Sequence, residues 1–259
     1  MEKNLKTALL QVDLAWEDPK ANLNKFDERI NNLQEPVDLI VLPEMFSTGF
    51  SMNANALAEE SNGPTVSWMK NTAKQQDAAL TGSVIIKENG NFYNRLFFVF
   101  PDGKYKTYDK RHTFTLANED KTYTAGKERL IVDYKGWRIC PLICYDLRFP
   151  VWARNTSEYD LLIYVANWPE TRIHAWDILL QARAIENMSY CIGVNRTGND
   201  GNEYKYNGHT AAYDCLGKNL FDNNRAHEFT QIITLDKSHV EDTRDKLKFL
   251  QDRDNFSIQ

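Results

Sequence analysis

Three side chains that can take part in acyl transfer come directly after apolar, strand-like stretches of the sequence. They are Glu44, Lys110 and Cys144. α/β folds place reactive groups at strand ends, beside the loops. A thiol becomes a strong nucleophile when a base removes its proton, a carboxylate can be that base, and an ammonium group is a fixed positive charge.

Each of these residues also has an ordinary structural interpretation. Most glutamates are solvated, and Lys110 belongs to a Lys-Arg-His run on what could be a surface. A cysteine such as Cys144 is most often a small buried hydrophobe. The spacing of Cys140 and Cys144, with no paired histidines, does not favour a metal site. His174 and His209 could serve a Cys-His dyad, although nothing around them supports one.

The remaining composition is that of an ordinary globular chain. The 259 residues are 42% hydrophobic and 26% charged, with a formal net charge of −5 and interspersed charges. The absence of a basic stripe argues against nucleic acid as a partner. The apolar runs are too short to span a bilayer, and no signal peptide is evident, so we expect no membrane association and a cytoplasmic location. Four cysteines are too few for a disulfide framework.

The elements that must position these side chains alternate between strands and helices. A mixed order of this kind favours sheets covered by helices in one domain over residues 1–259, and leaves one sheet or two open. Two later segments, 209–214 and 228–235, are expected to pair with each other around a turn at Gly217. Residues 110–128 are expected to form a long loop, and long loops in compact domains are usually functional. Strands are predicted at 7–12, 37–42, 79–86, 92–100, 104–108, 129–133, 137–143, 160–166 and 191–195, and helices at 65–77, after Pro150 and at 173–188, besides one beginning at Asp18-Pro19.

Three sequence motifs place the reactive residues in a recognisable order. They are Leu42-Pro43-Glu44, Tyr108-Asp109-Lys110-Arg111-His112 and Cys144-Tyr145-Asp146-Leu147-Arg148-Phe149-Pro150, followed by Ala166-Asn167-Trp168-Pro169 and by the segment 181–187. Together they resemble the signature segments of the nitrilase superfamily, the carbon–nitrogen hydrolases, over nearly the whole chain. The resemblance implies an α/β (α+β) fold, a four-layer αββα sandwich of the nitrilase type. It also implies a homodimer or larger homo-oligomer paired through the outer helices.

The same resemblance implies a role for each residue in amide hydrolysis. Cys144 is the expected nucleophile of a covalent thioester, and Glu44 is its general base and proton shuttle. Lys110 and the backbone N–H of Tyr145 are expected to stabilise the oxyanion. Glu119 resembles a second, supporting glutamate, the alternative being a solvated side chain beside Asp120. No cofactor and no metal are expected.

Finer details of the motifs resemble the ω-amidase branch. Members of that branch hydrolyse α-keto acid monoamides such as α-ketoglutaramate and α-ketosuccinamate to the dicarboxylate and ammonia. Thr113 departs from the residue usually found at this position of the lysine motif. The departure bears on the choice of substrate more than on catalysis. The alternatives are another amidase of the superfamily, acting on N-carbamoyl or aliphatic amides, or a non-catalytic scaffold that binds small acids.

A small-molecule amide with a keto-acid end carries a carboxylate, so its pocket should offer a cation. Arg148 and Arg172 are the candidates, because a guanidinium binds a carboxylate bidentately. Arg148 could instead pair with Asp146 or with a backbone carbonyl. The other expected substrate-binding residues are Phe114, Asn167 and Trp168, although Trp168 could equally be a packing residue.

Overall fold

The first sheet is built from both ends of the chain. In the computed structural model, which describes residues 4–221 and 226–258, its strands run in the order β13-β1-β2-β3-β4-β5. β1, β2 and β3 are parallel. β13 pairs antiparallel with β1, β4 pairs antiparallel with β3, and β5 pairs antiparallel with β4. The bounds are β1 (Asn4–Gln11), β2 (Leu39–Val41), β3 (Ala79–Glu88), β4 (Asn91–Val99), β5 (Tyr105–Asp109) and β13 (Phe229–Asp236).

The second sheet comes from the later part of the chain and runs in the order β12-β9-β8-β7-β6. Its central strands β7, β8 and β9 are parallel and almost wholly apolar, which is the pattern of strands covered on both faces. The strands are β6 (Val132–Tyr134), β7 (Trp137–Ile143), β8 (Leu161–Val165), β9 (Tyr190–Val194) and β12 (Ala211–Tyr213), with a separate ribbon of β10 (Thr197–Asn199) and β11 (Lys205–Asn207).

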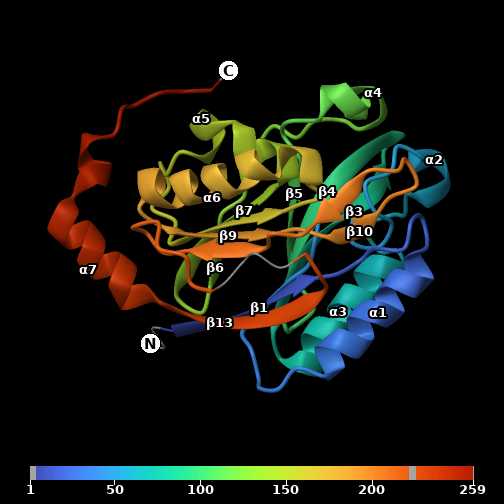
Figure 1. Cartoon of the computed structure of the whole chain (residues 1–259), viewed down its shortest axis with the longest axis horizontal. Helices are drawn as coiled ribbons and strands as arrows, with labels where there is room; N and C mark the ends of the chain where they lie inside the picture. Colours follow the sequence, from blue (N-terminus) through green and yellow to red (C-terminus); the bar gives the residue numbers. More distant parts are fainter. Residues whose placement is uncertain (1–3, 222–225, 259) are drawn as a thin grey trace.

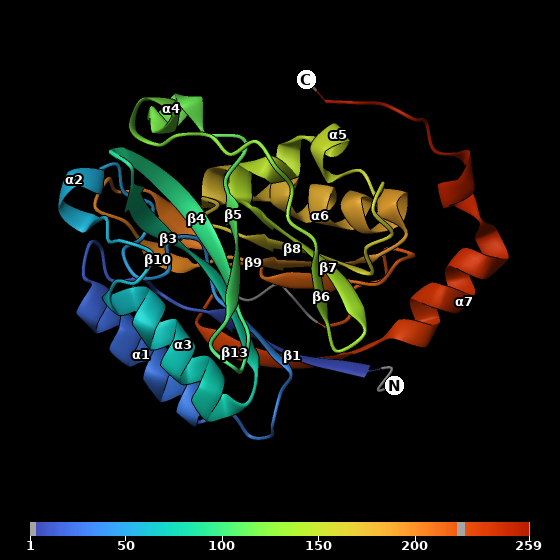
Figure 2. The same ribbon diagram turned by 180° about the vertical axis from the view of Figure 1, so that it is seen from behind.

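Helices cover the outer face of each sheet, as Figures 1 and 2 show. α1 and α3 lie against the first sheet, while α5 and α6 lie over the second, at the opposite side of the molecule. The helices are α1 (Pro19–Asn31), α2 (Ala54–Leu57), α3 (Pro64–Gln76), α4 (Glu119–Thr122), α5 (Pro150–Ala153), α6 (Ile173–Asn187) and α7 (Lys237–Leu247), with 3₁₀ turns η1 (Thr115–Ala117), η2 (Cys144–Arg148), η3 (Glu170–Arg172) and η4 (Phe249–Asp252).

The core lies in three apolar layers. Phe26 of α1 and Met69 of α3 pack under the first sheet, and Trp176 and Leu180 of α6 pack on the second. Between the sheets, side chains such as Phe98 belong to the same buried cluster as those of β7 and β8. Burial of each large side chain contributes about 1.5–3 kcal/mol. The expected four-layer αββα sandwich is therefore confirmed, and that residues 1–259 form one domain stays a prediction.

One expected pairing is wrong. The segment 209–214 does not pair with 228–235: β12 pairs with β9 in the second sheet, and β13 pairs with β1 in the first. The turn at Gly217 is real, since its amide donates to the Asp214 carbonyl. After this turn the chain passes from the second sheet, which contains β12, to the first sheet, which contains β13. β13 pairs there with β1, a strand far away in sequence. Such pairing follows from tertiary packing and not from local turn signals.

The strand ends place the reactive loops together. β2, β5 and β7 each end just before one of the three motif residues, and the expected loop at 110–128 contains η1 and α4. No helix within residues 4–221 and 226–258 is long and apolar enough to cross a bilayer.

Candidate active site

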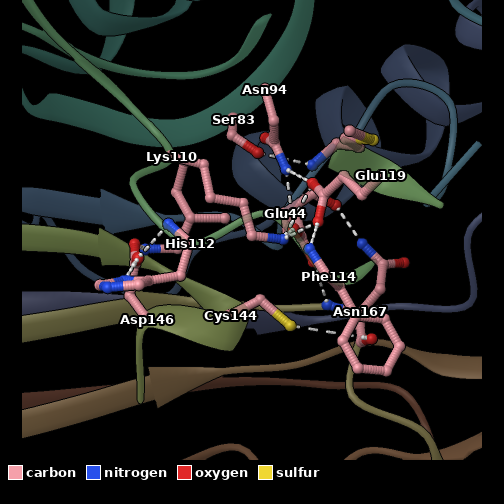
Figure 3. A network of polar contacts seen from close by, with 12 residues as sticks. Glu44, Ser83, Asn94, Lys110, His112, Phe114, Glu119, Cys144, Asp146 and Asn167 are labelled. Carbon is pink, nitrogen blue, oxygen red and sulfur yellow. Dashed lines mark hydrogen bonds and ion pairs between the residues drawn. The ribbon is translucent and has the colours of Figure 1, made fainter. Parts of the chain in front are cut away.

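Four side chains predicted from the sequence meet at one point between the sheets (Figure 3). Glu44 follows β2, Lys110 follows β5, Cys144 begins η2 after β7, and Glu119 begins α4. Glu44 and Glu119 are fully buried, Lys110 is 1% exposed and Cys144 is 9% exposed. The alternatives of a solvated Glu44, a surface Lys110 and a solvated Glu119 are therefore wrong.

The Lys110 ammonium group is shared between the two carboxylates. Its Nζ lies 2.8 Å from Glu44 Oε1, and 3.0 and 2.9 Å from the two carboxylate oxygens of Glu119. Burial by itself would lower the pKa of Lys110, but the charges of Glu119 and Glu44 outweigh it and raise that pKa. Burial raises the pKa of Glu119, and Lys110 opposes that rise. Lys110 is thus a permanent cation inside the site.

The Glu44 carboxylate is fixed at both oxygens. Oε1 accepts from Lys110 and from Asn94 Nδ2 at 2.8 Å, and Oε2 accepts from the backbone N–H of Asn167 at 2.9 Å. The side-chain amide of Asn167 also donates to the Glu44 carbonyl. These contacts join the end of β2 to the segment after β8, so the carboxylate is held in place before any substrate arrives.

Cys144 has an uncommon backbone conformation for a residue with a side chain. Its φ is +40°, in the left-handed region that costs a non-glycine residue energy and often marks functional sites. Its Sγ lies 4.0 Å from the carbonyl oxygen of Asn167. Tyr145 follows in the first turn of η2, where backbone N–H groups have no partner inside the helix.

The Cys144 thiol is neutral at rest. Burial raises its pKa well above the ordinary value, and the charge of Glu44 adds to that rise, while Lys110 opposes it. A neutral thiol is a weak nucleophile, so attack by Cys144 requires a base that takes its proton in the same step. Glu44 is the neighbouring carboxylate that can do so.

Sequence reasoning missed the residue that holds the nucleophile's turn. The buried Asp146 carboxylate accepts from the Ile143 amide at 3.1 Å and from the Tyr108 hydroxyl at 2.7 Å. It also contacts the amide and Nδ1 of His112, at 3.0 and 2.8 Å. Asp146 thus ties the Cys144 turn to the segment that carries Lys110. Two of its three partners, Tyr108 and His112, stand in the motifs, and an aspartate two residues after Cys144 was the available signal.

A cavity of about 520 Å³ opens onto Cys144 and Lys110. Tyr145 lines it, and so does every substrate-binding residue expected from the sequence. These expected residues are Phe114, Arg148, Asn167, Trp168 and Arg172. Asp146 was the alternative partner of Arg148, but the Asp146 carboxylate has the partners described above. The Arg148 guanidinium lies instead 4.9 Å from the centre of the Trp168 ring. The Arg172 guanidinium lies 5.0 Å from the Phe114 ring, so both cations stack on aromatic walls.

Another part of the lining was not found from the sequence. It comes from residues 50–53 and from the turn between β10 and β11, and it includes Glu17 and Asp200. Both carboxylates already have protein partners, since Glu17 accepts from Ser51 and Asp200 accepts from Tyr206. These residues come from loops without any motif, so nothing in the pattern singled them out.

The histidines considered from the sequence lie outside this cavity. His209 Nδ1 pairs with Asp177 at 3.0 Å, and neither His209 nor His174 is among the cavity-lining residues. The described residues give Cys144 no histidine partner, so the Cys-His dyad alternative is not supported by the geometry.

Comparison with known proteins gives a consistent family. The family model described as carbon–nitrogen hydrolase matches residues 6–245. The chain is 44% identical to an ω-amidase of Escherichia coli, with 98% of each chain covered. It is 36% identical to a 2-oxoglutaramate amidase of Bacillus subtilis, covering 83% of this chain and 85% of that protein.

A solved structure agrees with these sequence relatives. A carbon–nitrogen hydrolase superfamily protein from Xanthomonas campestris, which carries an arsenic adduct in its active site, superposes with a TM-score of 0.96. It is 41% identical to this chain, and 99% of each chain is covered.

The raised pKa of Cys144 generates a spectroscopic prediction. Thiolate absorbance near 240 nm, taken as wild type minus Cys144→Ala, should show no step between pH 6 and 9, because the folded site keeps this thiol protonated throughout that range. Urea-unfolded protein serves as the control and should show the ordinary step near pH 8.5. A step below pH 8 in the folded protein would contradict this assignment.

Proposed function

This chain belongs to the carbon–nitrogen hydrolase family, and we propose on that premise that it is an ω-amidase. It hydrolyses the terminal amide of α-keto acid monoamides such as α-ketoglutaramate and α-ketosuccinamate, and releases the dicarboxylate and ammonia. The observation that carries the proposal is the buried cluster of Cys144, Glu44 and Lys110. Cys144 and Lys110 of this cluster line a cavity that two arginines also line.

The first half-reaction makes a thioester. Glu44 removes the Cys144 proton as Sγ attacks the carbonyl carbon of the terminal amide, and the carbonyl oxygen takes up negative charge. The Lys110 ammonium group and the Tyr145 N–H stabilise that oxyanion, and loss of one such donor typically slows the reaction about 10²–10³-fold. Glu44 then gives its proton to the nitrogen, the C–N bond breaks, and ammonia leaves.

The second half-reaction uses the same groups on water. Glu44 takes a proton from a water molecule, the resulting hydroxide adds to the thioester carbon, and the C–S bond breaks as Cys144 regains its proton. The dicarboxylate then leaves. Glu119, bonded to both Lys110 and the Phe114 amide, keeps the ammonium group beside Glu44 in both halves. Its role is therefore to support the catalytic charges, without touching the substrate.

The arginines account for the acid end of the substrate. We assign the α-keto carboxylate to Arg148 and Arg172, because a guanidinium stacked on an aromatic ring still presents its in-plane N–H groups to a carboxylate. Trp168 and Phe114 serve as the walls on which they stack, and Asn167 lies between this pair and Glu44.

A substrate panel tests the activity directly. Purified protein is expected to release ammonia from α-ketoglutaramate, with far lower kcat/KM for N-carbamoyl amino acids and short aliphatic amides. Cys144→Ala should abolish turnover because no thioester can form, and its far-UV spectrum should match the wild type. Release of ammonia from no ω-amide would overturn the ω-amidase assignment, and retained activity in Cys144→Ala would overturn the nucleophile.

The arginine assignment makes a second prediction. Arg148→Met and Arg172→Met should each raise KM for α-ketoglutaramate about ten- to hundred-fold, since hydrogen bonds to charged groups contribute about 1.5–3 kcal/mol. Turnover of a short neutral amide that lacks the carboxylate is the control and should change little. An equal loss with both substrates would show that the arginines act on structure and not on the carboxylate.

We further propose a homodimer in a reducing, cytoplasmic compartment. All four cysteines are free thiols, as expected in such a compartment. On α6, Trp176 and Leu180 point into the core, whereas Ile178 and Ile185, two turns apart, are about half exposed. Val151 of α5, the other helix over the second sheet, is 56% exposed, so α5 and α6 offer the apolar face for a second copy.

The oligomeric state gives a third prediction. The double variant Ile178→Glu/Ile185→Glu should shift the mass in light scattering from dimer toward monomer, because the new charges cannot be buried in an apolar interface. Phe249→Glu in η4, at another exposed apolar position, should leave the mass unchanged. A monomeric wild type at micromolar concentration would overturn the dimer.

A further inference from the structure

Asn94 contacts three of the four segments that carry the reactive side chains of the site. It lies inside β4, where asparagine is disfavoured, and is 1% exposed. The backbone carbonyl oxygen of Asn94 accepts from the Lys110 backbone N–H at 3.0 Å. Its Nδ2 donates to Glu44 Oε1 at 2.8 Å and to Glu119 Oε1 at 3.2 Å (Figure 3). One residue therefore meets the strand end that carries Lys110 and both carboxylates.

The amide orientation follows from its surroundings. Asn94 Oδ1 is buried and has no hydrogen-bond partner among the described residues. The reverse orientation would bring this acceptor oxygen against the carboxylate oxygens of Glu44 and Glu119, which are themselves acceptors. The site accepts an unpaired Oδ1, which is a costly arrangement in a buried place, in order to direct the N–H₂ group at the carboxylates.

The charges explain why such a donor is needed. Glu44 and Glu119 both contact one ammonium group, so the three side chains carry a net charge of −1 when both carboxylates are ionised. Two like charges in a buried site favour uptake of a proton by one of them. A neutral donor shared between the two carboxylates opposes that uptake of a proton. A second cation would also oppose it, but its charge would cancel the net charge of −1 and make the carboxylate a weaker base.

We propose that Asn94 is a positioning residue for this reaction: its amide group holds Glu44 and Glu119 around Lys110, with the Glu44 carboxylate placed to take the proton of Cys144. This inference rests on the proposed function. Asn94 is absent from the cavity lining, and so are Glu44 and Glu119, whereas Lys110 and Cys144 line it. Asn94 therefore acts through Glu44, and its loss should lower kcat while leaving KM nearly unchanged.

Asn94→Leu tests the proposal through a pH profile. Leucine has a similar size and lacks the donor, so the acidic limb of kcat against pH should move up by about one to two pH units, the equivalent of one hydrogen bond to a charged group. Activity should recover as the pH rises, because loss of a donor to a carboxylate favours its protonated form and higher pH reverses that effect. Asn94→Asp, which keeps the shape and adds a third carboxylate, should move the limb in the same direction.

The matched control is Asn155→Leu. Asn155 is a fully buried asparagine bonded to Tyr159 and Asn187, away from the cavity. Its replacement should lower the melting temperature and leave the acidic limb in place. An unmoved limb in folded Asn94→Leu and Asn94→Asp, or an equal shift in Asn155→Leu, would overturn the role of Asn94.

Alkylation of Cys144 by iodoacetamide separates this proposal from the proposed function. The rate, followed by mass spectrometry of the peptide that contains Cys144, depends on Glu44 as base and needs no amide substrate. Its acidic limb should move up in Asn94→Leu as the kcat limb does. A wild type that turns over no ω-amide, together with a displaced alkylation limb, would remove the substrate assignment and keep the role of Asn94.

Discussion

The active site depends on one ammonium group shared by two buried carboxylates. Three charged side chains without solvent would be strongly unfavourable unless each oxygen and each N–H met a partner. Lys110, Glu44 and Glu119 satisfy this condition only because the ends of β2 and β5 meet the start of α4. Contacts through Asn94, Phe114 and Asn167 hold these segments together. The sandwich positions the cluster, and the cluster in turn requires the loops to stay in register.

Proton transfer follows from that arrangement. The Cys144 thiol is too deeply buried to ionise by itself, so the nucleophile exists only in the presence of a base and a target. The ammonium group of Lys110 is already fixed in the site by its two carboxylate partners, so its positive charge is in place before a substrate arrives. The backbone of Cys144, with its positive φ, aims the thiol at the cavity, and Asp146 holds that turn against the strand that supplies Lys110.

Much of this architecture could be predicted from the sequence. Apolar runs such as 161–165 indicated buried strands, and Asp18 and Pro19 indicated the start of α1. The ordered motifs led to one hypothesis for Glu44, Lys110 and Cys144. The partners of β12 and β13 could not be predicted, because both pair with strands far away in the chain. Asn94 and the lining at Glu17 and Asp200 were also missed, since their roles arise only where separate loops meet.

The volume of the cavity bears on where the second reactant comes from. At about 520 Å³ it can hold several water molecules, each of which fills about 30 Å³ of the liquid, in addition to a small acid amide. After ammonia leaves, the water that regenerates the thiol can already be waiting in the same chamber. The acyl group and the water that removes it therefore fit into the cavity together, so hydrolysis of the thioester does not require the acyl chain to leave its binding place first.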